Sequence, residues 1–214
     1  MINKNVLVEK IPLIEPKWVE LGSRIYQKVW EIGVKSDRLW GSVKAINKMG
    51  QEYDCSKLNI LDIGCNCGVL SVVASEHFNS AIGIDINAKS IDGARETAKF
   101  FGKSNCRFEA KGVKKYLESG GFERDNITAI MAYQVLYLLS NEEVKGILNR
   151  MDKVKAVIFG SRPSKNRSKS KYGLWTDKSI RKYLVSPFFD SCEILYKHES
   201  RWPIVFANKG DKIA

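Results

Sequence analysis

An apolar run in the first third of the chain contains an acid and is followed by two glycines. The run at residues 58–63 includes Asp62, and the turn after it contains Gly64, Asn66 and Gly68. Such a run is typical of a buried strand, and ligands of open α/β sheets bind at the carboxyl ends of the strands. An ionised carboxylate accepts hydrogen bonds only, which suits a ligand that presents hydroxyl or amino donors. These residues therefore predict a ligand-binding turn.

The spacing of the glycines excludes two common phosphate-binding turns. A dinucleotide site has the pattern G-x-G-x-x-G, but counting from Gly64 this chain has Asn66 and Val69 at the second and third glycine positions. A P-loop needs G-x-x-x-x-G-K-[ST], which the sequence also lacks. Two glycines four residues apart, preceded by an acid, indicate a ligand without a pyrophosphate.

A second acid ends the next apolar run. Asp85 lies in the run at residues 80–86, and Asn87 is a good cap for the helix expected to run to residue 101. Asp62 and Asp85 are therefore expected at the same edge of the sheet. Each also has a simpler reading, Asp62 as a turn carboxylate that accepts backbone N–H groups and Asp85 as a helix start.

The order of elements predicts an α/β fold with a doubly wound, mostly parallel seven-stranded sheet and helices on both faces. Apolar runs alternate with helical spacing from residue 58 onward, and such alternation requires right-handed crossovers. Two strand-like segments near the end are separated only by a short turn, which predicts a C-terminal antiparallel hairpin. Strands are expected at residues 58–63, 80–86, 105–110, 127–133, 156–159, 192–197 and 203–208. Ser140 with Glu143 predicts a capping box at the start of the helix that follows the fourth strand.

The chain divides into two parts on this pattern. Residues 1–56 form an N-terminal helical extension, with apolar stripes at helical spacing from Trp18 to Ile32 and from Leu39 to Met49. Residues 57–214 form the ligand-binding domain. The extension is a candidate lid or wall for a second substrate, although its aromatic residues suit core packing equally well.

Asp62, Gly64 and Gly68 match the first motif of the class I S-adenosylmethionine-dependent methyltransferases, which this chain resembles from about residue 58 to residue 209. Gly83-Ile84-Asp85 matches the second motif, whose acid accepts hydrogen bonds from both ribose hydroxyls in that family. The resemblance implies S-adenosylmethionine as the cofactor. It departs from the family at Gly112, where an acid that accepts from the adenine amino group is common.

The resemblance also implies a set of contacts. Gly112 and Val113 would lie beside the adenine, and residues 132–134 would flank the methionine end of the cofactor. The cofactor-binding residues predicted in this way are Asp62, Gly64, Cys65, Asn66, Gly68, Asp85, Ile86, Gly112, Val113, Ala132 and Gln134.

The acceptor is less well defined. The end of the fourth strand reads Ala132-Tyr133-Gln134 and lacks the [D/N]-P-P-[Y/F] motif of enzymes that methylate amide or amino nitrogens. This resembles the small-molecule branch of the family, and we expect methyl transfer to an oxygen of a small or saccharide-like acceptor. No cysteine lies in an obvious catalytic motif, which argues against a covalent C5-type mechanism. Tyr133, His198 and Glu199 are weak candidates for a base, and no catalytic residue is assigned.

Positive charge is the one unusual bulk property. The 214 residues carry a net charge of +11, and residues 161–175 hold Arg162, Lys165 and three further basic residues without an acid. The segment follows the fifth expected strand, so we expect it at the binding edge of the sheet, where it could act as a lid over an anionic acceptor. Tyr133, Arg162 and Lys165 are the predicted acceptor contacts. A solvated loop is the alternative.

The charge leaves two other functions open, an RNA methyltransferase and a non-catalytic module that binds S-adenosylmethionine. Composition is otherwise ordinary for a globular protein, with 44% apolar and 28% charged residues. The five scattered cysteines and two histidines lack metal-ligand spacing, so no metal is expected. No apolar run is long enough for a membrane span, and a cytoplasmic location is the default expectation.

Overall fold

The computed structural model describes residues 37–160, 177–190, 192–194 and 204–209. They contain one seven-stranded sheet with the strand order β3-β2-β1-β4-β5-β7-β6. The strands are β1 (Asn59–Ile63), β2 (Ser80–Asp85), β3 (Cys106–Ala110), β4 (Ala129–Tyr133), β5 (Ala156–Gly160), β6 (Glu193–Ile194) and β7 (Ile204–Asn208).

The directions of the strands show which edge of the sheet holds the carboxyl ends of β1 and β4. The pairs from β3 to β5 are all parallel, whereas β7 runs antiparallel to both β5 and β6. The predicted mostly parallel sheet with a C-terminal antiparallel hairpin is confirmed. Strand order reverses at β1, because the chain proceeds outward to β2 and β3 on one side and to β4 and β5 on the other. The crevice beyond the carboxyl ends of β1 and β4 is where ligands of such sheets bind.

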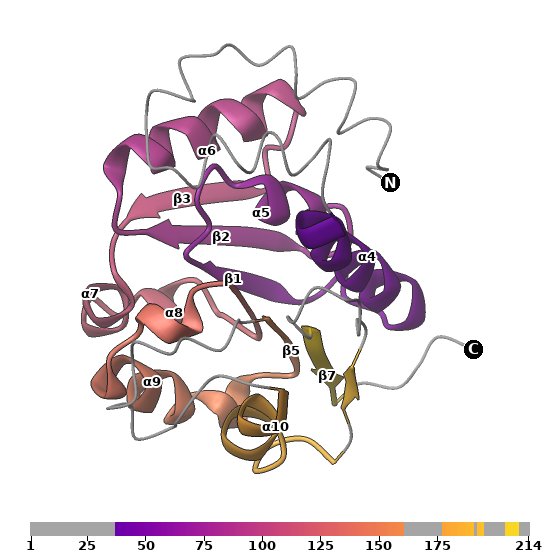
Figure 1. Ribbon diagram of the computed structural model, residues 1–214. Helices are drawn as coiled ribbons and strands as arrows, with labels where there is room; N and C mark the ends of the chain where they lie inside the picture. The colour runs from indigo at the N-terminus through magenta and orange to yellow at the C-terminus, as the bar shows by residue number, and fades with distance from the viewer. Residues whose placement is uncertain (1–36, 161–176, 191, 195–203, 210–214) are drawn as a thin grey trace.

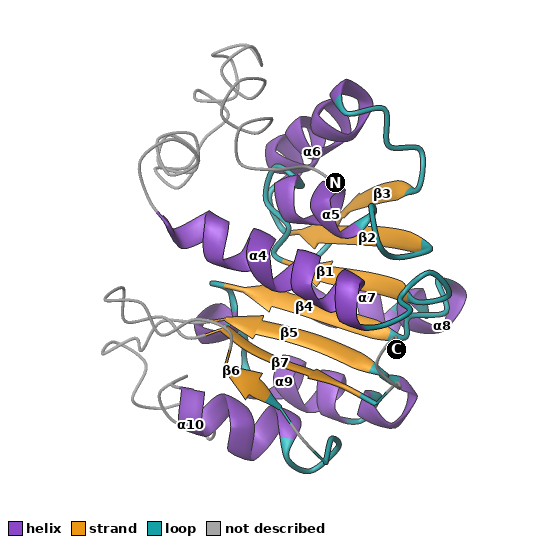
Figure 2. Ribbon diagram, turned by 90° about the vertical axis from the view of Figure 1, so that its right-hand side faces the viewer, coloured by secondary structure: helices purple, strands orange, loops and turns teal. Residues whose placement is uncertain are grey.

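Helices cover both faces of this sheet (Figures 1 and 2). Two separate apolar clusters show the same division: one includes Val43, Val72 and Ile91 with one side of the sheet, and the other includes Tyr116 and Val144 with the opposite side. On the first face lie α4 (Asp37–Glu52), α5 (Val69–Ala74) and α6 (Ala88–Phe100), and on the second α7 (Val113–Glu118), α8 (Gly121–Arg124), α9 (Asn141–Leu148) and α10 (Asp177–Ile180).

The helix starts follow the capping residues in the sequence. Asn87 caps α6 by accepting from the backbone N–H groups of Lys89 and Ser90, and Ser140 with Glu143 forms the predicted capping box of α9. The short helix α8, which is a single turn, was not expected from the pattern. Helix α10 continues as a π-helical turn at Arg181–Val185.

The second expected N-terminal helix is α4, which begins at Asp37. Its apolar stripe at Val43, Ile46 and Met49 is fully buried against the sheet and α5. The first expected helix, residues 18–32, lies outside the described residues. None of the helices in the described parts of the chain is long and apolar enough to cross a membrane.

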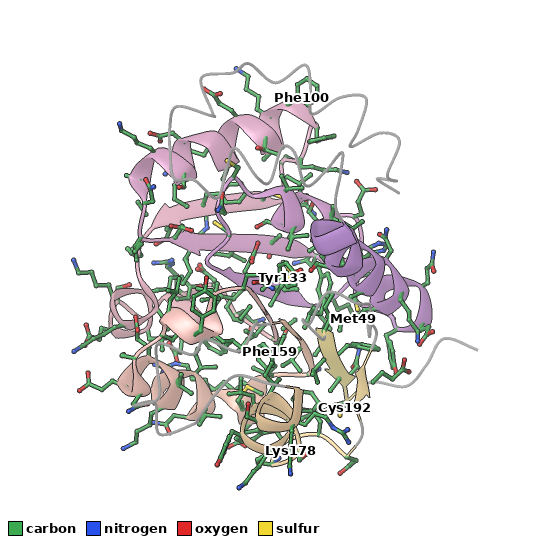
Figure 3. All side chains as sticks on the ribbon, in the orientation of Figure 1. Met49, Phe100, Tyr133, Phe159, Lys178 and Cys192 are labelled. Atoms are coloured by element: carbon green, nitrogen blue, oxygen red, sulfur yellow. The ribbon has the colours of Figure 1, made fainter. Side chains whose placement is uncertain are left out.

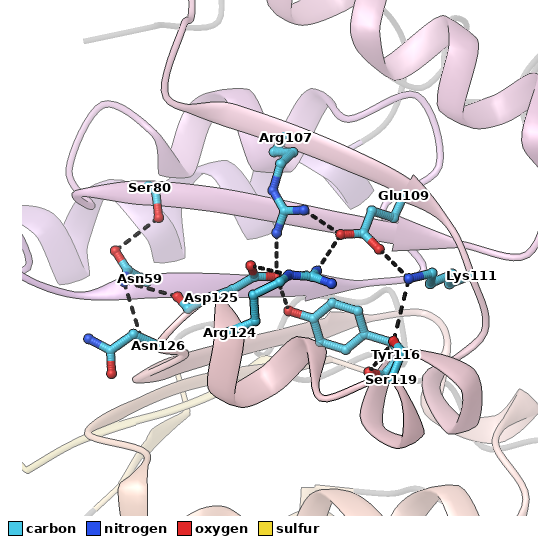
Figure 4. A network of polar contacts seen from close by, with 10 residues as sticks. All are labelled: Asn59, Ser80, Arg107, Glu109, Lys111, Tyr116, Ser119, Arg124, Asp125 and Asn126. Carbon is cyan, nitrogen blue, oxygen red and sulfur yellow. Dashed lines mark hydrogen bonds and ion pairs between the residues drawn. The ribbon is translucent and has the colours of Figure 1, made fainter.

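A polar network fastens α7 and α8 to β3 (Figure 4). Asp125, at the end of α8, accepts hydrogen bonds from the Tyr116 hydroxyl at 2.8 Å and from Arg124 at 2.9 and 3.0 Å. Arg107 of β3 forms an ion pair with the same carboxylate. Asn59, the first residue of β1, donates its side-chain amide to the backbone oxygens of Asp125 and Asn126. The network therefore lies toward the amino end of β1.

Candidate functional site

The turn after β1 folds back over the end of β2. The backbone N–H groups of Gly64 and Cys65 both donate to the carbonyl oxygen of Ile84, at 2.8 and 3.0 Å. Gly64, Asn66 and Gly68 have φ values of 70°, 57° and 71°, which lie in the left-handed region. Three left-handed residues within five positions make a tight turn that glycine and asparagine tolerate best.

Close packing is a second reason for both glycines. A Cβ atom on Gly64 would lie 2.7 Å from Val135 Cγ2. A Cβ on Gly68 would lie 2.8 Å from the ring of Phe108 and 2.9 Å from the Ala94 Cβ. Both contacts are shorter than real Cβ atoms make, so the turn can pack against β3, α6 and the end of β4 only without side chains at these positions.

Asp85 is the carboxylate that the turn holds in place. Its Oδ2 accepts the backbone N–H of Asn66 at 3.2 Å, and its Oδ1 accepts the N–H of Asn87 at 2.9 Å. The side chain is only half-buried. Because each carboxylate oxygen can accept more than one hydrogen bond, both oxygens keep capacity for two hydroxyl donors of a ligand.

Ile86, the next residue, is the most exposed of the large apolar side chains in the described parts of the chain, with 83% of its surface accessible. It lies beside Gly112, because a Cβ on Gly112 would be 3.3 Å from Ile86 Cγ2. An anchored carboxylate next to an exposed apolar side chain fits a nucleoside, whose ribose is hydrophilic and whose base has two apolar faces. The residues present therefore fit the adenosine part of the predicted cofactor.

Asp62 has a different environment from Asp85. Its side chain is buried, and its Oδ2 accepts the hydroxyl of Ser71 in α5 at 2.6 Å. Burial raises the pKa of Asp62 to about 7, and the charge of Asp85 acts in the same direction, while the hydrogen bond from Ser71 opposes it. Asp62 therefore connects β1 to α5 beneath the turn. Its place in the fold suits positioning of the turn rather than direct contact with a ligand.

Three other predicted residues also turn their side chains into the protein. Those of Cys65, Val113 and Ala132 are buried. Burial raises the pKa of the Cys65 thiol well above its usual value. At these positions only the backbone is available to a ligand in the crevice.

The end of β4 contributes a further left-handed residue. Gln134 has a φ of 61°, and its backbone N–H donates to the carbonyl oxygen of Gly160 at 2.7 Å. Tyr133 packs over Gly160, since a Cβ there would lie 2.5 Å from Tyr133 Cδ2. In Figure 3 Tyr133 lies near the centre of the molecule, whereas Phe100 and Lys178 lie at its periphery. The β4 end thus brings polar groups to the edge that also carries Asp85.

Two groups of residues were predicted on the acceptor side, the basic segment after β5 and the weak candidates for a base. Arg162, Lys165 and the rest of the basic segment 161–175 lie outside the described residues, as do His198 and Glu199. In the parts of the chain that the structure describes, no three His, Cys, Asp or Glu side chains are grouped to hold a metal ion.

Three residues of this edge were not identified from the sequence as site residues. Ser71 holds Asp62, Val135 closes the space over Gly64, and Glu143 approaches Gly112. A lone serine in the apolar segment 69–74 was the one available signal for the first. Glu143 was recognised only as part of a capping box.

Comparison with known proteins agrees with this geometry. Residues 54–177, more than half of the chain, match the family model described as a methyltransferase domain. The chain therefore belongs to this methyltransferase family, and the predicted enzyme class is confirmed.

Among curated proteins, a tRNA (uracil(54)-C(5))-methyltransferase of Saccharomyces cerevisiae is 32% identical over 72 residues. That match spans 34% of this chain and only 11% of the yeast protein.

Solved structures show the same fold at low sequence identity. The magnesium protoporphyrin IX methyltransferase of Synechocystis PCC 6803, crystallised with S-adenosylmethionine, is 17% identical with a TM-score of 0.60, and 98% of each chain is covered. The N-methyltransferase NodS of Bradyrhizobium japonicum WM9 is 16% identical with a TM-score of 0.59, covering 81% of this chain and 96% of its own. An rRNA methylase of Streptococcus thermophilus is 8% identical with a TM-score of 0.55, covering 77% and 94%. The predicted cofactor is thus the one bound in the Synechocystis relative.

Proposed function

We propose that the chain binds S-adenosylmethionine at the carboxyl ends of β1 and β2 and transfers its methyl group to an oxygen of a small or saccharide-like, anionic acceptor. The observation that carries the cofactor part is Asp85, which two backbone N–H groups hold beside the exposed Ile86. Membership of the methyltransferase family supports the reaction.

When bound, the cofactor supplies a methyl group on a positively charged sulfur, which an acceptor attacks in line. The task of the protein is to hold the two reactants in that alignment, with the acceptor atom about 3 Å from the methyl carbon. In our proposal Asp85 anchors the ribose, and the backbone of Gly64, Asn66 and Gly68 shapes the turn around it. Residues 132–134 at the end of β4 flank the methionine end, because β4 is the neighbour of β1 across the switch point.

We assign the acceptor side to residues 1–56 and to the basic segment 161–175. Residues 1–56 would act as an extension that walls the pocket, with α4 as its anchor, because the apolar stripe of α4 is buried in the core of the 57–214 domain. Arg162 and Lys165 would contact the acceptor from the basic segment after β5. The net charge of +11 supports an anionic acceptor.

RNA is the second candidate acceptor, and two observations favour it. The chain is strongly basic, and the yeast protein that it resembles over 72 residues is by name a tRNA methyltransferase. A carbon atom of a base is a poor nucleophile and would need activation by a thiolate. Burial raises the pKa of both the Cys55 and the Cys65 thiols, Cys55 to about 12. These two thiols therefore do not suit such a role.

The test is transfer of a labelled methyl group from S-adenosylmethionine to two separated fractions of cell extract, one of RNA and one of small anionic metabolites. We expect label in the small-molecule fraction with the wild type and none with Asp85→Ala. Asp92→Ala is a matched control, since Asp92 is an exposed acid of α6 paired with Arg95. Label in RNA alone would replace the proposed acceptor by the second candidate. Cofactor binding without label in either fraction would support a non-catalytic module.

A further inference from the structure

Ile86, Gly112 and Glu143 come from different elements and lie close together. Residue 112 is the position where class I methyltransferases commonly have an acid. Gly112 precedes α7 and lies at the carboxyl end of β3. A Cβ on Gly112 would lie 3.3 Å from Ile86 Cγ2 and 4.0 Å from Glu143 Oε1. The turn after β2, the start of α7 and the first turn of α9 thus converge around one small space, which the missing side chain of Gly112 leaves open.

The carboxylate of Glu143 is held by one of its two oxygens. Oε2 accepts the backbone N–H of Ser140 at 2.8 Å and its hydroxyl at 3.0 Å, within the capping box of α9. Among the residues that the structure describes, Oε1 has no hydrogen-bond partner, and it is the oxygen that approaches Gly112. The capping box therefore holds in place an acceptor that the described part of the chain leaves without a donor.

Glu143 Oε1 is connected to Asp85 through two neighbours, because the Cβ position of Gly112 is close to both Glu143 Oε1 and Ile86, the residue after Asp85. The base of a nucleoside is attached to the ribose carbon next to the one that carries the 2′-hydroxyl, so it extends only a short way from the carboxylate that takes the ribose hydroxyls. Ile86 follows Asp85 directly and offers an exposed apolar side chain to a flat ring. The edge of that ring would face the space between Gly112 and Glu143.

We propose that Glu143 Oε1 is the acceptor for the exocyclic amino group of the cofactor's adenine and determines selectivity for that base. Gly112 leaves the room that this approach needs, so a carboxylate from α9 takes the place of the acid that is missing after β3. An ionised carboxylate cannot donate a hydrogen bond, and it therefore favours an amino base over one with a keto oxygen at the same position. This inference rests on the proposed function.

The test compares two ligands that differ only at that position, S-adenosylhomocysteine and its inosine counterpart, by calorimetric titration of the full chain. We expect the wild type to bind the adenosine form roughly 10- to 100-fold more tightly, the range for a hydrogen bond to a charged group. In Glu143→Gln the amide oxygen can still accept from Ser140, so α9 keeps its cap, while the amide N–H₂ can donate to a keto oxygen. In this variant we expect the affinities for the adenosine and inosine forms to differ by no more than a few-fold.

A matched control and a rescue separate recognition from structure. Glu142→Gln changes the preceding acid of α9, which pairs with Lys114, and should keep the wild-type preference. Adding Gly112→Asp to Glu143→Gln should restore the preference for the adenosine form, because the new carboxylate can accept from the adenine amino group. The position can take a side chain, since residue 112 has φ −75° and ψ 161°, which any residue adopts, and Ile86 needs to move only slightly.

The outcomes distinguish this inference from the proposed function. An unchanged preference in Glu143→Gln, or no preference in the wild type, would overturn the role of Glu143 and leave cofactor binding intact. Failure of the wild type to bind either ligand would overturn the proposed function as well. The melting temperature of each variant without ligand shows whether the capping box has survived.

Discussion

A buried or partly buried acid lies near each end of β1, and the surroundings shift the pKa values of the two acids in opposite directions. At the amino end, Asp125 receives hydrogen bonds from Arg124 and Tyr116 and an ion pair from Arg107. Burial alone would raise the pKa of Asp125, but these partners outweigh it and lower the pKa. At the carboxyl end, Asp62 has the hydroxyl of Ser71 as its hydrogen-bond donor, and burial raises its pKa to about 7.

Both ends contain non-glycine residues in the left-handed region, Asn66 and Gln134 at the carboxyl end and Asn126 at the amino end, so backbone strain does not distinguish them. Exposed apolar surface does, because Ile86, the most exposed large apolar side chain of the described residues, lies at the carboxyl end. The amino end uses its polar groups to fasten α7 and α8 to the sheet. From the environments of the acids and the exposure of Ile86 we infer that one end stabilises the fold, while the other is arranged for a ligand.

The largest expected effect is the pH dependence caused by Asp62. Its folded pKa of about 7 exceeds the ordinary value of 3.8, so the folded state holds the extra proton between these values. The contribution of this group to stability is therefore full below about pH 4 and is lost as the pH rises to about 7, by about 4 kcal/mol for three pKa units. Chemical denaturation at a series of pH values should show this decline in the wild type and not in Asp62→Asn.

The exposed Asp92→Asn is the control for that series and should follow the wild type. The difference between the wild-type and Asp62→Asn free energies of unfolding, plotted against pH, reports the titration of the Asp62 carboxyl. The destabilisation caused by burying an amide does not depend on pH and only offsets the two curves. Parallel curves from pH 4 to pH 8 would contradict the assignment of a raised pKa to the carboxyl end.

Asp125→Ala should have the next largest effect. It removes the shared partner of Arg107, Arg124 and Tyr116, and because both arginines are partly exposed we expect a loss of about 1–3 kcal/mol in the free energy of unfolding. Since the pKa of Asp125 is lowered in the folded state, its contribution should vanish as the pH falls below its ordinary value of 3.8. Affinity for S-adenosylhomocysteine should not change. An equal loss of affinity and stability would remove the distinction between the two ends.

The smallest effect concerns the packing of the first turn. Gly64→Ala places a Cβ against Val135 at a left-handed position, and we expect it to cost about 2 kcal/mol more than an unstrained substitution. Gly102→Ala is the matched control, since Gly102 has a φ of 65° but no atom within 4 Å of its Cβ position. It should cost about 1 kcal/mol from backbone strain alone. If Val135→Ala does not reduce the cost of Gly64→Ala, steric contact is not the cause.

The sequence predicted the features that local chemistry determines. Asn87 and Ser140 predicted two helix starts because a cap acts on its own helix, and the alternation of runs predicted the parallel sheet. The pattern of Asp62, Gly64 and Gly68 predicted a tight turn after β1, which the left-handed φ values of both glycines show, and its ligand stays a prediction. It did not show that Asp62 lies buried against Ser71, or that Glu143 approaches Gly112, because both contacts join elements far apart in the sequence and depend on how helices pack on the sheet.

The central claim is that Asp85 anchors an adenosine-containing cofactor at the carboxyl ends of β1 and β2. Calorimetric titration with S-adenosylhomocysteine, NAD and ATP tests it directly in the wild type and in Asp85→Ala. We expect binding of S-adenosylhomocysteine alone, and a loss of about 2–4 kcal/mol of affinity in the variant, from one or two hydrogen bonds to a charged group. The melting temperature of Asp85→Ala without ligand should fall modestly, because the variant also loses the hydrogen bonds from the Asn66 and Asn87 N–H groups. Asp85→Asn, whose amide oxygen still accepts one of these N–H groups, separates that loss from the loss of ligand binding. Wild-type affinity in Asp85→Ala, or binding of NAD in place of S-adenosylhomocysteine, would contradict the account.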